Sequence, residues 1–163
     1  AMQMADFVAA VDDCPSFTAC ACIIADVCRG NVGQLAADVL ITTLEMKRVG
    51  YIDDAAVIPA VGNEGAKLTV NVEIFYCDAH KLFLLQQRAP ALPSLAEEWG
   101  SRLAGWAKAA GFKVVLCLSS LPAEIRTDRQ LEQGQRQLSV ECSLPGKEAH
   151  RRAAEELQWK CVR

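Results

Sequence analysis

The sequence lacks a basic footprint and a long hydrophobic run, and each absence excludes a class of protein. Seventeen Lys and Arg residues oppose twenty Asp and Glu residues, for a net charge of −3, so the positive surface typical of nucleic-acid-binding domains is missing. The longest apolar segment, residues 19–27, contains Asp26 and is far shorter than the ~20 residues of a transmembrane helix. No secretory leader precedes it. We therefore expect a soluble, intracellular protein without nucleic-acid or membrane partners.

Internal repeats, low-complexity tracts and Pro/Gly-rich linkers are also missing. The 163 residues suffice for one domain that buries roughly two thirds of its unfolded surface without disulfide or metal crosslinks. We therefore expect a single domain that spans residues 1–163.

The cysteine content is high, with eight residues in the chain, yet 52% of all residues are hydrophobic. Disulfide scaffolds belong mostly to short secreted domains with small cores, so reduced thiols are the better interpretation. Cys20 and Cys22 are two positions apart and should share one face of a strand. Zinc binding by Cys14, Cys20, Cys22 and Cys28 is an alternative, but their spacing contains no Cys-x-x-Cys pair. We expect no metal and no cofactor.

A strand, a tight turn and a helix are predicted between residues 19 and 48. The apolar run of residues 19–27 leads into the sequence Gly30-Asn31-Val32-Gly33-Gln34, after which apolar residues recur at helical spacing. Asn31 is positioned to cap the helix through its side chain. Gly50 is positioned to end it in a left-handed conformation.

The middle of the chain predicts further strands. Residues 57–61 form a short apolar run that ends in a polar loop containing Gly62 and Asn63. Residues 68–76 alternate apolar and polar side chains, as in a half-buried strand. A turn at residues 78–80 then leads into residues 81–87, which predicts a hairpin.

A second helix is predicted over residues 95–110. Ser94 and Glu97 have the spacing of a capping box, and Gly111 is positioned as the C-terminal cap. Trp99 and Trp106 lie on one side of this helix, which favours core packing, while an exposed docking role is the alternative. Residues 113–118 form an apolar run typical of a central strand covered on both faces.

The last part of the chain has a weaker signal. Residues 126–137 are polar and predict a surface loop, with a short strand near residues 138–142 and a final helix over residues 147–162 whose outer face carries Arg151, Arg152, Glu155 and Glu156. The whole pattern predicts an α/β fold with a mixed sheet and helices on both faces.

Two patterns could support chemistry. A turn with Gly30 and Gly33 before a helix could cradle a phosphate, but it lacks the third glycine of a dinucleotide fingerprint and the Gly-Lys-Ser/Thr of a P-loop. A close strand-to-helix turn is therefore the preferred interpretation, and nucleoside or nucleotide binding is the alternative.

A catalytic serine is the second possibility. Ser119 and Ser120 follow a predicted strand, and His80, His150 and Asp128 could serve as partners. No Gly-x-Ser-x-Gly motif surrounds the serines. We expect them to hydrogen-bond the strand end, and we expect no enzymatic activity.

Several short motifs, in the same order along the chain, resemble the proteasome assembly chaperone 2 family. They are GNVGQLA at residues 30–36, VGYI at 49–52, VGN at 61–63, the Gln86-x-Arg88 ending of the hairpin, WAK at 106–108, LSS at 118–120, and Leu157-x-Trp159. The resemblance points to Gly30, Asn31, Val32, Gly33, Gln34, Gly62 and Asn63 as motif residues.

The resemblance implies a non-enzymatic chaperone of the cytoplasm, with the nucleus as an additional location. It would pair with proteasome assembly chaperone 1 and hold proteasome α-subunits during assembly of the α-ring. The implied fold is a three-layer α/β sandwich related to nucleoside phosphorylases. A docking tail with a tyrosine, used by some relatives, cannot be assigned because no tyrosine follows Tyr76.

An uncovered sheet edge is expected when the protein is made alone. The predicted strand pair of residues 68–88 offers such an edge. We therefore expect a homo-oligomer in isolation.

Overall fold

The computed structural model describes residues 8–10, 14–65, 67–120, 137–138, 152, 156 and 160–161. The chain divides into two compact units, Ala1–Ser120 and Leu121–Arg163. Each unit is described by itself below. Among the described helices, none is both long enough and apolar enough to cross a membrane.

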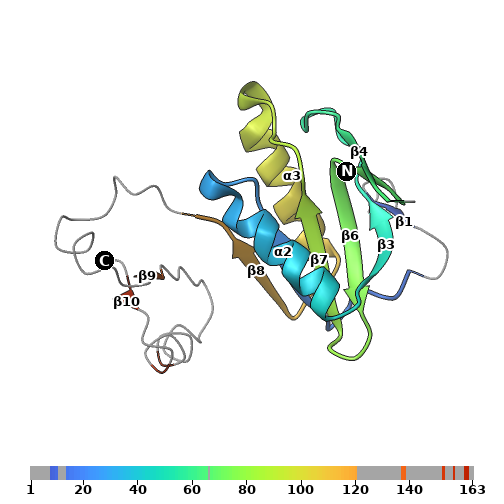
Figure 1. Cartoon of the computed structure of the whole chain (residues 1–163), viewed down its shortest axis with the longest axis vertical. Helices are drawn as coiled ribbons and strands as arrows, with labels where there is room; N and C mark the ends of the chain where they lie inside the picture. The colour runs from blue at the N-terminus through green and yellow to red at the C-terminus, as the bar shows by residue number, and fades with distance from the viewer. Residues whose placement is uncertain are drawn as a thin grey trace. The chain divides into compact units, whose positions relative to one another are not determined.

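A six-stranded mixed sheet forms the centre of the first unit (Figure 1). Its strands, in spatial order, are β1 (Ala9–Ala10), β3 (Lys47–Tyr51), β6 (Val72–Cys77), β7 (Leu82–Gln87), β2 (Ala21–Ala25) and β8 (Val114–Leu118). The strands β7, β2 and β8 are parallel, whereas β1, β3, β6 and β7 pair antiparallel. The predicted α/β fold with a mixed sheet is confirmed.

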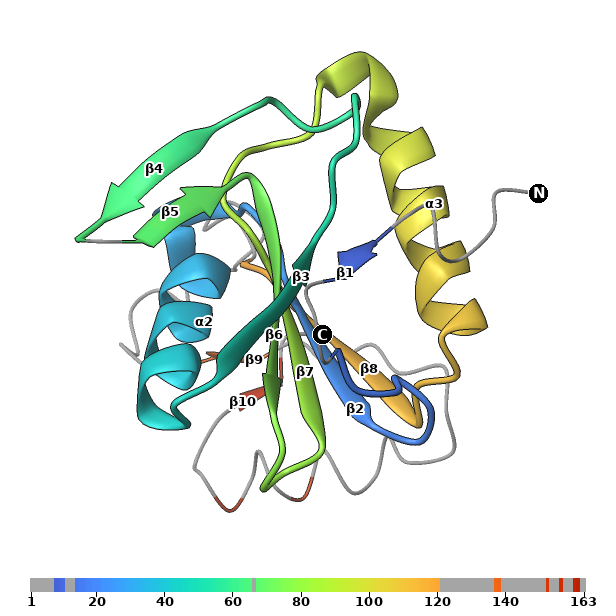
Figure 2. The same cartoon turned by 90° about the vertical axis from the view of Figure 1, so that its right-hand side faces the viewer.

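Helices α2 (Val32–Thr43) and α3 (Ala96–Ala109) cover opposite faces of the sheet (Figure 2). Each is preceded by a short 3₁₀ turn, Arg29–Asn31 and Pro93–Leu95 respectively. The strand period of two explains the division of the core. In β7, Phe83 belongs to the core cluster beneath α3, while the next residue, Leu84, belongs to the cluster beneath α2.

The α3 face is closed by aromatic side chains. Phe83 is fully buried and contacts the rings of Phe17, Tyr76 and Phe112 at centroid distances of 4.7, 4.6 and 5.7 Å. Trp106 packs edge-on against Phe17 and Phe112. Such tilted and edge-to-face pairs add to the free energy gained by burial.

The two tryptophans of α3 are core residues, as predicted. Both are buried, and the indole Nε1 of Trp99 donates a hydrogen bond to Gln87 Oε1 at 3.2 Å. A buried indole normally requires such an acceptor. The alternative, an exposed docking pair, is therefore wrong for Trp99 and Trp106.

The α2 face has a smaller core. Ala25, Ala37, Met46, Cys77 and Leu84 are buried there. Apolar residues on the outer side of α2 remain exposed, namely Val32, Leu35 and Val39. The side of α2 that points away from the sheet is therefore an exposed apolar surface.

The predicted strand of residues 68–76 is broken at Asn71. β5 (Lys67–Val70) pairs with β4 (Val61–Glu64) in a separate two-stranded sheet, and β6 begins only at Val72. The Asn71 carbonyl accepts a hydrogen bond from the Arg88 amide at 2.7 Å, which holds the chain in a bend. The hairpin between β6 and β7, with its turn at residues 78–80, is confirmed.

Two other strand predictions need correction. Residues 57–61 contain only an isolated bridge between Val57 and Ala91 before β4 starts at Val61. The prediction that residues 68–88 offer a free sheet edge is also wrong for β6 and β7. Both strands lie inside the large sheet, between β3 and β2.

The ends of α2 differ from the prediction in detail. Asn31 occupies the N-cap position, as predicted, but its side chain makes no capping hydrogen bond, and its backbone is left-handed with φ 53°, as asparagine tolerates. At the other end Glu45, with φ 47°, takes the left-handed conformation expected of Gly50. Gly50 lies within β3, opposite Ile74 at a break in register.

The start of α3 also differs from the prediction. Residues Pro93–Leu95 form a 3₁₀ turn, and the helix has no side-chain cap at its first residue, so the capping box of Ser94 and Glu97 is wrong. The C-terminal end matches the prediction, because Gly111 has φ +73°.

The position of β8 corrects a further prediction. Within the described residues β8 pairs only with β2 and forms an edge of the sheet. Val115 is 37% exposed and Leu116 43% exposed. The apolar run predicts a strand that favours burial. It does not predict which other elements lie beside that strand and bury it.

In the described part of the second unit, β9 (Gln137–Leu138) and β10 (Lys160–Cys161) pair in parallel. The predicted strand near residues 138–142 overlaps β9 at Leu138, and residues 139–142 lie outside the described residues. Arg152 and Glu156 are helical and exposed, as predicted, but the predicted helix is wrong at Lys160–Cys161. The other predictions for residues 121–163 lie outside the described residues.

Candidate functional site

Gly33 lies where α2 approaches the sheet most closely. A Cβ atom built on Gly33 would lie 2.7 Å from the Leu118 carbonyl oxygen and 2.8 Å from the Asp26 carbonyl oxygen. Backbone atoms cannot move aside as a flexible side chain can. The glycine therefore permits the contact between α2 and the carboxyl ends of β2 and β8, which is a structural reason for this residue.

The turn before α2 satisfies several of its own polar groups. Gly30 has φ +69°, a conformation that favours glycine. The amide of Asn31 donates to the Cys28 carbonyl at 3.0 Å, and the amide of Gly33 donates to Cys28 Sγ at 3.3 Å. The first turn thus uses part of its hydrogen-bonding capacity internally, while the side chain of Val32 remains exposed.

The second predicted segment, Gly62 and Asn63, lies on β4 of the small hairpin. Both residues are exposed. A Cβ atom on Gly62 would lie 2.7 Å from Thr69 Oγ1 on the paired strand, so close side-chain packing across the hairpin explains this glycine. Asn63 pairs with Leu68 in the β4–β5 register.

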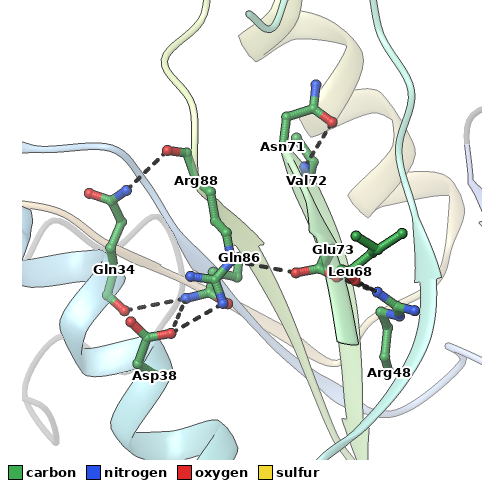
Figure 3. Close-up of polar contacts among 9 residues, drawn as sticks. All are labelled: Gln34, Asp38, Arg48, Leu68, Asn71, Val72, Glu73, Gln86 and Arg88. Carbon is green, nitrogen blue, oxygen red and sulfur yellow. Dashed lines mark hydrogen bonds and ion pairs between the residues drawn. The ribbon is translucent and has the colours of Figure 1, made fainter. Parts of the chain in front are cut away.

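A buried carboxylate links the hairpin to the sheet (Figure 3). Glu73 on β6 is 1% exposed and accepts from Arg48 Nη1 at 2.7 Å and from Arg88 Nε at 3.4 Å. Arg48 Nη1 also donates to the Leu68 carbonyl on β5 at 2.7 Å. A buried carboxylate requires such compensation, because an unpaired charge in the interior is very unfavourable.

A second set of polar contacts joins α2 to β7. Gln86 is fully buried, and its Nε2 donates to Asp38 Oδ1 at 2.6 Å. Arg88 Nη2 forms an ion pair with the same Asp38 oxygen at 3.4 Å. The Nε2 of Gln34 donates to the Arg88 carbonyl at 3.4 Å.

The side-chain oxygens Gln34 Oε1 and Gln86 Oε1 are buried without a hydrogen-bond partner. An unsatisfied buried acceptor costs about 1–3 kcal/mol. We refer to six side chains as the polar cluster: Gln34, Asp38, Arg48, Glu73, Gln86 and Arg88. Its two unsatisfied acceptors make the polar cluster contribute less to folding stability than the aromatic core on the other face.

The polar cluster connects the two segments that the sequence motifs single out. Gln34 of α2 contacts Arg88, Arg88 contacts Glu73, and Glu73 reaches the β4–β5 hairpin through Arg48. Gly30, Asn31, Gly62 and Asn63 take no part in these contacts. The two segments are thus linked through side chains of the intervening strands.

Those candidate catalytic groups that the structure describes do not converge. Ser120 Oγ donates to the Arg29 carbonyl at 2.7 Å, so its hydroxyl joins the end of β8 to the turn before α2. His80 lies in the turn before β7, at the opposite end of the parallel strands. His150 and Asp128 lie outside the described residues.

The cysteines form no metal site within the described part of the chain. Cys14, Cys20, Cys22, Cys28, Cys77 and Cys117 are all free thiols. Cys20 and Cys22 are both buried in the core beneath α3, which confirms their predicted shared face. Burial, followed by the proximity of Cys117, raises the pKa of Cys22 to about 12, and a protonated thiol is a poor metal ligand.

Sequence reasoning did not identify the polar cluster. Gln86 and Arg88 entered only as parts of a family motif, and Glu73 only as a polar position in an alternating strand. The available signal was a polar residue next to apolar positions of a strand: Glu73 lies between Val72 and Ile74 in β6, and Gln86 follows four apolar residues in β7. Such residues mark buried polar positions when the strand proves to be central.

Comparison with known proteins gives the family. The PAC2 family model matches residues 29–157. The chain is 36% identical to proteasome assembly chaperone 2 of Danio rerio over 162 residues, covering 94% of this chain and 62% of the relative. It is 34% identical to proteasome assembly chaperone 2 of Bos taurus over 133 residues, covering 77% of this chain and 50% of the relative. The chain thus spans about half to two thirds of the length of these relatives.

Solved structures share the fold at low sequence identity. The chain is 16% identical to Pyrococcus furiosus PbaA, an archaeal homologue of proteasome-assembly chaperone, with a TM-score of 0.62 over 96% of this chain and 60% of that chain. Pyrococcus furiosus PbaB, an archaeal proteasome activator, gives a TM-score of 0.62 at 15% identity, over 97% of this chain and 67% of that chain. The sequence matches establish the family independently of these structures. The chain therefore belongs to the PAC2 family.

Proposed function

We propose that this chain assists assembly of the α-ring of the core proteasome, as a heterodimer with proteasome assembly chaperone 1 that binds α-subunits. The observation that carries the proposal is the sequence match to proteasome assembly chaperone 2 over most of the chain. Action in the cytoplasm, and also in the nucleus, follows from the same assignment. The same match also supports a three-layer α/β sandwich fold related to that of nucleoside phosphorylases.

Two properties of the described residues support a function based on protein surfaces. Ser119, Ser120 and His80 do not form a catalytic arrangement. Large apolar side chains are exposed on α2, β8 and the β4–β5 hairpin, and exposed apolar surface of this kind is typical of protein interaction sites.

Co-expression with proteasome assembly chaperone 1 from the same organism tests the pairing. We expect a 1:1 complex by light scattering when the partner carries an affinity tag, and we expect this complex to retain α-subunits added to it. A tagged α/β protein of similar size serves as the control bait. Recovery of a folded chain that binds neither the partner nor α-subunits would contradict the proposal.

A further inference from the structure

The β4–β5 hairpin is a two-stranded ribbon that stands apart from the large sheet (Figure 2). Among the described residues, its strands pair with each other and with no further strand. A two-stranded ribbon is marginally stable by itself in water, because it has no third strand or helix against which to bury apolar side chains. The hairpin therefore depends on the contacts that join it to the rest of the first unit.

The apolar side chains of the hairpin contribute little to these contacts. The register pairs Val61 with Val70 and Asn63 with Leu68, so these residues share one face of the ribbon. On that face Val61 is 75% exposed and Leu68 is 63% exposed. A region with few buried apolar side chains opens locally at a low cost in free energy.

The guanidinium of Arg48 fastens the hairpin to the large sheet (Figure 3). Arg48 Nη1 on β3 donates to the Leu68 carbonyl of β5 at 2.7 Å. The same nitrogen carries a second hydrogen and donates to Glu73 Oε1, also at 2.7 Å. Glu73 lies on β6 and is 1% exposed, so a buried carboxylate holds the guanidinium in place through a charge-assisted hydrogen bond.

The two ends of the hairpin are held by backbone hydrogen bonds instead. The Asn71 carbonyl, directly after β5, accepts from the Arg88 amide at 2.7 Å. Before β4, the Ile58 amide donates to the Pro90 carbonyl at 3.1 Å. These bonds do not involve the side chain of Arg48. Loss of the Arg48 contact therefore releases the hairpin between two fixed ends and leaves the large sheet intact.

We propose that the β4–β5 hairpin opens as a separate unit while the large sheet stays folded, and that Glu73 holds it closed through Arg48. Glu73 is thus a positioning residue, which acts on the hairpin through the guanidinium that it orients. Segments that move or become ordered on binding are drawn from such low-stability parts of a fold. The inference concerns the folding of this chain and does not rest on the proposed function.

Native-state hydrogen exchange of the full chain tests whether the hairpin is a separate unit. We expect the amides that join β4 to β5 to exchange faster than those that join β6 to β7. In low urea, exchange in the hairpin should change little, because local opening exposes little surface, whereas exchange in β6 and β7 should accelerate. Equal rates and equal urea dependence in the two regions would overturn the proposal, because the hairpin and the sheet would then open together.

Arg48→Met tests the contact that keeps the hairpin closed. We expect exchange in the hairpin to accelerate about tenfold, as the loss of one hydrogen bond from a charged group implies. Arg48→Lys keeps a cation beside Glu73 but loses the planar fork of donors, and it should accelerate exchange in the same direction. The matched control is Lys81→Met, which removes a cation from the exposed pair with Asp78. Hairpin exchange in both Arg48 variants at the rate of this control would contradict the role of Arg48.

A double-mutant cycle tests whether Glu73 acts through Arg48. Glu73→Gln weakens the bond to the guanidinium while keeping the shape of the side chain. It should accelerate hairpin exchange severalfold when Arg48 is present and should add nothing measurable in the Arg48→Met background. Equal acceleration in the two backgrounds would show that Glu73 affects the hairpin by another route and would overturn its assignment as the positioning residue.

Discussion

The two faces of the central sheet are stabilised by different interactions. Beneath α3 the core is aromatic and closed, with Phe83 at its centre. Beneath α2 the core is smaller, and a chain of polar and charged side chains, of which Glu73 and Gln86 are buried, runs beside it to the β4–β5 hairpin. Among the described residues, apolar side chains are also exposed on the outer side of α2 and on the edge strand β8. Stability is therefore concentrated on one face, and the surface available for binding on the other.

The largest expected effect is the loss of the aromatic core. Phe83→Ala removes a fully buried ring from between Phe17, Tyr76 and Phe112, and we expect the free energy of unfolding to fall by about 3–5 kcal/mol. Urea denaturation measures the change. Val39→Ala, at an exposed position of α2, is the control and should change the free energy of unfolding little. Equal losses from the two substitutions would contradict the division between the faces.

The next effect concerns the contact between α2 and the sheet. Gly33→Ala forces a Cβ atom against two backbone carbonyls, and we expect it to destabilise the protein by about 1–3 kcal/mol. Gly33→Val should cost more than Gly33→Ala. The melting temperatures of the wild type and of both variants measure these losses of stability.

Gly100→Ala in α3 is the matched control for Gly33. A Cβ atom there meets nothing within 4 Å, so the substitution should stabilise the helix by about 0.5–1 kcal/mol. If Gly33→Ala left stability unchanged and abolished binding of a phosphate-bearing ligand instead, the packing explanation of Gly33 would be wrong.

The polar cluster should contribute a smaller amount. Glu73→Gln keeps the shape of the side chain but removes the charge that Arg48 and Arg88 share. We expect a loss of about 1.5 kcal/mol in unfolding free energy, at the lower end for a charged hydrogen bond because both arginines reach solvent. The control is Asp78→Asn in the exposed pair with Lys81, for which we expect little change by the same denaturation measurement.

The smallest effect is a pH dependence of stability from Cys22. Its pKa is raised from 9.0 to about 12, so its contribution is fully present below pH 9 and is lost as pH rises toward 12. The slope for one such group is about 1.4 kcal/mol per pH unit. Between pH 8 and pH 10 the wild type should therefore lose about 1 kcal/mol more unfolding free energy than Cys22→Ala loses. If the wild type and Cys22→Ala lost the same unfolding free energy in urea titrations at the two pH values, burial would not raise the pKa of the Cys22 thiol.

Local patterns predicted most of the elements in the first unit. The strand at residues 21–25, the helix after Gly33, the hairpin of β6 and β7 and the tryptophan-bearing helix all follow from apolar spacing and turn residues. The helix ends were predicted less well, because Glu45 and Asn31 adopt left-handed conformations without being glycine. Both residues lie in turns closed by local backbone hydrogen bonds, from Asn31 to Cys28 and from Met46 to Ile41.

Sheet order and the polar cluster could not be predicted from one sequence. The apolar character of β8 is the same whether the strand is central or at an edge, so the exposure of Leu116 depends on which strands lie beside it. Glu73 and Arg88 are separated along the chain and meet only because β6 and β7 pair. Long-range pairing is not encoded in local periodicity.

Affinity purification of the tagged chain from its source cells, followed by quantitative mass spectrometry, tests the central claim most directly. The account predicts enrichment of a second assembly chaperone together with proteasome α-subunits, relative to a tagged control protein. It also predicts that Phe83→Ala, which disrupts the core, abolishes this enrichment. Recovery of the folded wild-type chain without α-subunits and without a second chaperone would contradict a role in proteasome assembly.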